Sequence, residues 1–66
     1  MDENLQPRLA SIEETARLLG GISSRAVEHL ISRGEIEIIR VYGRKRAVVV
    51  DSIDRYIDRL TEQQSA

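Results

Sequence analysis

Four cations lie close to a glycine in the middle of the chain, where they could neutralise phosphate groups. Arg44, Lys45 and Arg46 directly follow Gly43, and Arg40 lies three residues before it. We expect cations at a tight turn to project outward, and a narrow minor groove of duplex DNA attracts arginine through its negative potential. The alternative is a solvated loop that keeps the protein soluble. Three adjacent cations at a turn favour the phosphate-binding interpretation.

A second group of polar side chains comes earlier, at the start of a predicted helix. Ser23 and Ser24 lie where unpaired backbone N–H groups and the helix dipole could hold a phosphate, although Ser23 could serve only as the helix cap. Arg25 follows in the first turn, where its guanidinium could bind guanine O6 and N7, a contact worth ~1–3 kcal/mol of discrimination. The alternative for Arg25 is a solvated arginine, which the helix dipole slightly disfavours.

Glu28 and His29 are predicted to face the same side of this helix as Arg25. Glu28 could accept a hydrogen bond from cytosine N4, but an orienting salt bridge or simple exposure fits a carboxylate near phosphates better. His29 could contact a base or a phosphate, or remain an exposed neutral side chain. We include both as candidate DNA-binding residues.

Two helices separated by a short glycine turn are predicted in the first half of the chain. Ser11 and Glu14 form a capping box at the first helix, which Gly20-Gly21 ends. The second helix begins with Ser23 as its cap, or Ser24 as the alternative, and runs to about residue 33. Their close spacing is typical of a helix-turn-helix.

The second half of the chain changes to a β pattern and then returns to a helix. Residues 35–42 and 47–50 are rich in β-branched side chains, and the turn 43–46 between them predicts a hairpin. Asp51 is predicted to cap a third helix, whose apolar positions are Ile53, Ile57 and Leu60. The expected fold class is α+β and mainly helical: a winged helix-turn-helix of three short helices and a two-stranded hairpin wing.

Composition excludes most other classes of protein. A chain of 66 residues allows one small domain, and with no cysteine and a lone His29 it offers no metal site. No spacing of nucleophile and base accompanies its serines and acids, so we expect no enzyme, no cofactor and no small-molecule substrate. No apolar run reaches the ~20 residues of a membrane span and no signal peptide is evident, so we expect no membrane partner and a cytoplasmic protein.

Charge is distributed unevenly along the chain, although the formal net charge is only −1. Residues 23–46 carry six cations against three carboxylates, while the segments on either side each hold two more acids than bases. A basic centre between acidic ends indicates one positive surface. With only two tyrosines as aromatic residues, a platform for single strands is disfavoured, and duplex DNA is the expected partner.

The order of these elements resembles the small winged-helix domains of the excisionase family, relatives of the MerR-like DNA-binding domain. The resemblance covers Leu9–Leu60 and rests on Ser11–Gly20, Ile22–Val27, Leu30–Ile36, Gly43–Arg46 and Asp51–Ile57. It implies that the second helix enters the major groove and that the hairpin lies against the neighbouring minor groove. Many members of the family bend DNA and set the direction of site-specific recombination, and others regulate transcription.

The resemblance implies a recombination directionality factor that acts with a site-specific integrase and with neighbouring copies of itself on DNA. A small transcriptional regulator and a protein-interaction module that recruits integrase are the alternatives. The expected organisation is a flexible arm at residues 1–8, the DNA-binding domain at 9–62 and a frayed tail at 63–66. The candidate DNA-binding residues are Ser23, Ser24, Arg25, Glu28, His29, Arg40, Arg44, Lys45 and Arg46.

Overall fold

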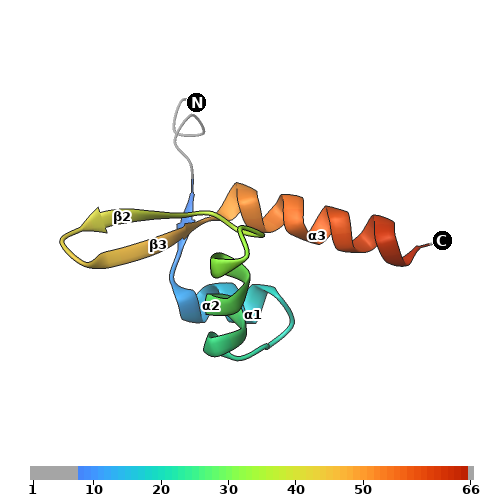
Figure 1. Ribbon diagram of the computed structural model, residues 1–66, viewed down its shortest axis with the longest axis horizontal. Helices are drawn as coiled ribbons and strands as arrows, with labels where there is room; N and C mark the ends of the chain where they lie inside the picture. Colours follow the sequence, from blue (N-terminus) through green and yellow to red (C-terminus); the bar gives the residue numbers. More distant parts are fainter. Residues whose placement is uncertain (1–7, 66) are drawn as a thin grey trace.

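Three helices and a three-stranded antiparallel sheet make up the part of the chain that the structure describes (Figure 1). The computed structural model describes residues 8–65, so the predicted arm lies outside it except for Arg8. The elements in chain order are β1 (Leu9–Ala10), α1 (Ile12–Leu18), α2 (Ser24–Ser32), β2 (Ile38–Tyr42), β3 (Lys45–Val49) and α3 (Val50–Gln64). This mixed α+β architecture is consistent with a winged helix. Within the described residues, no helix is long and apolar enough to cross a membrane.

The starts of α1 and α2 follow the local sequence closely. The Ser11 hydroxyl accepts a hydrogen bond from the Glu14 N–H at 3.0 Å, and the Glu14 carboxylate accepts one from the Ser11 N–H at 2.8 Å, which confirms the predicted capping box. Ser23 caps α2 by accepting from the Ala26 N–H at 3.1 Å. Gly20 follows α1 with a φ of 90°, a left-handed conformation that glycine adopts without steric cost.

The predicted cap of α3 is wrong. The helix begins two residues earlier than expected, with Val49 at the N-cap position and Asp51 inside the first turn. The buried Ser52 hydroxyl instead accepts from the Glu37 N–H at 2.9 Å and donates to the Val49 carbonyl at 2.7 Å. This contact joins α3 to the segment before β2, so it depends on chain folding and not on local sequence. The predicted tail at residues 63–66 is helical as far as Gln64.

The sheet has one strand more than the predicted two-stranded hairpin. Its order is β1-β3-β2, with Leu9 opposite Val49 and Ala10 opposite Val48. The pairing extends one residue further, because the Arg8 carbonyl accepts a hydrogen bond from the Val50 N–H at 2.9 Å. Strand β1 has only two residues, too few to show the alternation that marks a strand in sequence.

The turn of the β2–β3 hairpin is shorter than predicted. Only Gly43 and Arg44 form the turn, while Lys45 and Arg46 belong to β3. The register shifts between Arg40 and Tyr42, so β2 carries a bulge next to the turn. Gly43 takes a φ of 54°, as the first central position of a two-residue hairpin turn requires. We call residues 38–49 the wing.

The core joins the wing to the helices. Val27 of α2, Val48 of β3 and Ile53 of α3 are each at most 1% exposed, and smaller buried side chains and Ile36 complete the cluster. Burial of an aliphatic side chain contributes roughly 1.5–3 kcal/mol, so burial of these three side chains is a large part of the stability of so small a domain. Because Val27 and Val48 belong to one cluster, the core fixes α2 and the wing relative to each other.

Candidate nucleic-acid interface

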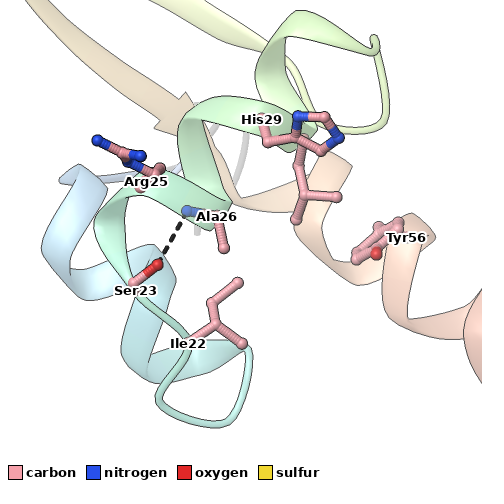
Figure 2. Close-up of a pocket in the computed structure, with 7 residues that line it drawn as sticks. Ile22, Ser23, Arg25, Ala26, His29 and Tyr56 are labelled. Carbon is pink, nitrogen blue, oxygen red and sulfur yellow. Dashed lines mark hydrogen bonds between the residues drawn. The ribbon is translucent and has the colours of Figure 1, made fainter.

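The N-terminal turn of α2 presents polar groups to solvent and carries no acid. Ser23, Ser24 and Arg25 are all exposed, and the Ser23 hydroxyl is bonded to the Ala26 N–H. In Figure 2 the Arg25 side chain points away from Tyr56 of α3, on the other side of the helix. Its guanidinium is therefore free to meet a ligand that approaches α2 from outside.

Glu28 of α2 binds Arg46 of β3 through both guanidinium nitrogens. The closer contact joins Arg46 Nη2 to Glu28 Oε2 at 2.6 Å, and the second joins Nη1 to Oε1 at 3.4 Å. Hydrogen bonding to this carboxylate, together with its charge, raises the pKa of Arg46 above its ordinary value. Within residues 8–65 this is the ion pair that joins the wing to α2.

The remaining wing cations point in different directions. Arg40 lies opposite Arg46 in the β2–β3 register and shares its face of the sheet, which also carries the buried Val48. Since successive side chains alternate across a strand, Lys45 lies on the other face. Arg44 is exposed in the turn. The run predicted as one cationic tip is thus divided between the helix side, the turn and the outer face.

His29 lies on the exposed side of α2 and borders a hollow between α2 and α3 (Figure 2). Of the nine candidate residues, the structure brings Glu28, Arg46 and Arg40 together across the α2–wing boundary. Ser23, Arg25 and His29 follow one another along α2. Within residues 8–65, no ion pair or side-chain hydrogen bond joins Arg44 or Lys45 to α2.

One relative supports the excisionase family. The chain is 41% identical over 58 residues to a probable excisionase of Saccharopolyspora erythraea, an alignment that covers 88% of this chain and 57% of the relative. The chain therefore spans a little more than half the length of that relative. No protein-family model matches the chain.

Tyr42 of the wing was not among the candidate residues predicted from the sequence. Tyr42 ends β2 next to Gly43 and is 86% exposed, the most exposed large hydrophobic side chain of the described residues. It lies opposite Lys45 in the register. Its position beside Gly43 indicated that Tyr42 lies near the turn. An alternating strand pattern, however, does not distinguish an exposed tyrosine from a packed one.

Proposed function

We propose that this chain is a winged helix-turn-helix protein that binds duplex DNA and acts as an excisionase. In this proposal α1 and α2 form the helix-turn-helix, α2 enters the major groove, and the wing lies against the adjacent minor groove. The observation that carries the proposal is the Glu28–Arg46 contact at 2.6 Å, because it joins strand β3 of the wing, two residues after the turn, to the exposed side of α2. One duplex could then meet both elements at once.

Each candidate residue has a distinct role in the proposal. Arg25 reads base edges, while Ser23 and Ser24 bind a phosphate at the start of α2. Arg44 and Lys45 neutralise phosphates from the wing.

The four remaining candidates, Glu28, His29, Arg40 and Arg46, act beside these contacts. Arg40 supports the phosphate contacts from β2, and His29 contacts the backbone further along α2. Glu28 acts indirectly, by holding Arg46 and with it the orientation of the wing.

The mechanism is architectural. A single small module buries only ~600–1,000 Å² on DNA, so several copies would bind neighbouring sites to reach useful affinity. Neutralising phosphates along one side of the duplex and widening a groove would bend it, at a deformation cost of roughly 1–6 kcal/mol repaid by the added contacts. The bent DNA would allow a site-specific integrase to assemble the excision complex.

A footprint on the DNA that flanks the gene, repeated at several salt concentrations, tests the proposal. Binding to direct repeats with bending of the duplex is the expected result, and affinity should fall by about 0.9 log units per log unit of salt for each phosphate neutralised. A single protected palindrome over a promoter would instead indicate a small transcriptional regulator. Undetectable or salt-insensitive binding would contradict DNA recognition and favour a protein-interaction module.

A further inference from the structure

The side of α2 that faces α3 contains an open hollow of about 500 Å³ (Figure 2). Its floor is apolar and consists of Ile22, Ala26, Leu30 and Tyr56, with Arg25 and His29 at the rim. In Figure 2 the side chains of Ile22, Ala26 and Tyr56 surround the empty space. This hollow is separate from the α2–wing boundary, which lies on the Glu28 side of the helix.

A second hollow of about 270 Å³ continues the first toward the end of α2. The two share Leu30 and Tyr56, and the second adds Leu60 to the apolar surface and Arg33 and Arg59 to the charged one. Together they form a groove between α2 and α3, which we call the α2–α3 groove. It has the shape and apolar floor that an amphipathic helix uses for docking.

The charge of the α2–α3 groove is opposite to that of the chain as a whole. Arg33, Arg59 and His29 line it against one carboxylate, Glu35, and Arg25 lies at its rim with the guanidinium directed away from Tyr56 (Figure 2). That carboxylate is shared between Arg59 at 3.1 Å and Arg33 at 3.6 Å, so it leaves the groove positive. None of the four acids of α3 lines either hollow: Asp51, Asp54, Asp58 and Glu62. The chain carries a formal net charge of −1, which makes this positive groove a local feature.

We propose that the α2–α3 groove binds an acidic amphipathic helix of a partner protein. Large apolar side chains of that helix enter the hollow over Leu30 and Tyr56, and its carboxylates pair with Arg33 and Arg59. A duplex fits the groove less well, because the Tyr56 hydroxyl is the one side-chain hydrogen-bond donor that its otherwise apolar floor offers a phosphate. Ser23, Arg25 and His29 border the first hollow and are also candidate DNA contacts. The peptide contacts inferred here instead use Leu30, Tyr56, Arg33 and Arg59, which the proposed function does not use.

The two tyrosines allow the proposal to be tested in the intact chain. With 3-fluorotyrosine incorporated, the ¹⁹F spectrum reports Tyr56 inside the groove and Tyr42 on the wing, and a Tyr42→Phe variant assigns the signals. The probe is a synthetic helical peptide of about 18 residues, with leucines along one face and glutamates beside them. Matched peptides carry glutamine for glutamate, or alanine for leucine. The expected result is a saturable shift of Tyr56 with the first peptide alone, while Tyr42 stays unchanged.

Two arginines provide a matched pair of variants. Arg33 and Arg55 are 60% and 57% exposed and lie 3.6 and 3.5 Å from a neighbouring glutamate, but only Arg33 lines the groove. Arg33→Glu should weaken the affinity for the first peptide about tenfold, whereas Arg55→Glu should change that affinity less than about twofold. An unmoved Tyr56 signal, equal binding of the matched peptides, or equal effects of the two variants would overturn the proposal. So would a DNA duplex that shifts Tyr56 and loses this effect in Arg33→Glu, which would assign the groove to nucleic acid.

Discussion

Helices α1 and α2 are capped by the same residue type but differ in the charge of their first turn. Ser11 and Ser23 each accept a hydrogen bond from the backbone N–H three residues later, at 3.0 and 3.1 Å. In α1 the first turn also holds Glu13 and Glu14, which offset the positive end of the helix dipole. The first turn of α2 contains no acid and exposes Arg25 instead.

This difference separates a helix with acids in its first turn from one whose first turn carries none. The N-terminus of α1 is neutralised within the chain, so α1 gains helix stability. The N-terminus of α2 forgoes that gain, and its uncompensated N–H groups and Arg25 favour an anion from outside. A stability cost at one position of a small domain is expected where function requires it.

Charge reversal in α2 should give the largest effect. Arg25→Glu should weaken duplex DNA binding about 100-fold, because it removes a base contact and adds a carboxylate that phosphates repel. The matched variant on α1, Arg17→Glu, changes the net charge equally and should weaken binding less than about threefold. Fluorescence anisotropy with one labelled duplex measures both. Similar losses for the two variants would show that net charge, and not the position of Arg25, determines binding.

The wing extends the comparison to a surface without a helix dipole. Replacing Arg44 and Lys45 together by alanine should weaken binding to every duplex roughly 30-fold. The slope of log affinity against log salt concentration should fall in magnitude by about 1.8, the value for two phosphates. We leave Arg46 unchanged because it is bonded to Glu28. Titrations of specific and random duplexes at several salt concentrations provide the measurement. A loss confined to the specific duplex would assign base reading to the wing.

Placing the capping box of α1 at the start of α2 should raise the stability of the domain while weakening its binding to DNA. Ala26 occupies the position in α2 that Glu14 occupies in α1, so Ala26→Glu should complete a capping box with Ser23. The unfolding free energy should rise by about 0.5 kcal/mol, while DNA affinity should fall about fivefold. Ala26→Gln is the matched control, since glutamine completes the box without a charge. Equal DNA affinities for the two variants would show that a negative charge in the first turn of α2 does not weaken DNA binding.

Local patterns explain why part of this structure could be predicted. The capping box of α1 and the Ser23 cap of α2 involve residues three apart, so their geometry follows from the helix itself. Asp51 satisfied the same local rule, but Val49 occupies the N-cap position of α3, and the Ser52 hydroxyl accepts from the N–H of Glu37 fifteen residues away. Strand β1 likewise forms only because Leu9 reaches Val49.

The candidate site shows the same limit. The residue types of the wing could be read from sequence, but their division between faces depends on where the turn ends and on the bulge before Tyr42. Glu28 was recognised as a possible partner in a salt bridge, yet its partner Arg46 lies eighteen residues away and could not be identified locally. The α2–α3 groove forms only when α3 packs beside α2 in the folded chain, so no local sequence pattern predicts it.

Acid should affect α1 through its capping box, and this is the smallest effect we expect. The backbone N–H of Ser11, with its hydroxyl and the charge of Arg17, holds the pKa of Glu14 below its ordinary value of 4.5. A carboxyl whose pKa is lower in the folded chain adds stability that is present above its unfolded pKa and is lost as the pH falls through its folded pKa. Thermal unfolding followed by circular dichroism should therefore show a steeper loss of Tm below about pH 4.5 for the parent than for Glu14→Gln. Glutamine keeps the hydrogen bond to the Ser11 N–H without titrating, so parallel curves would show that the acid response of the domain arises elsewhere.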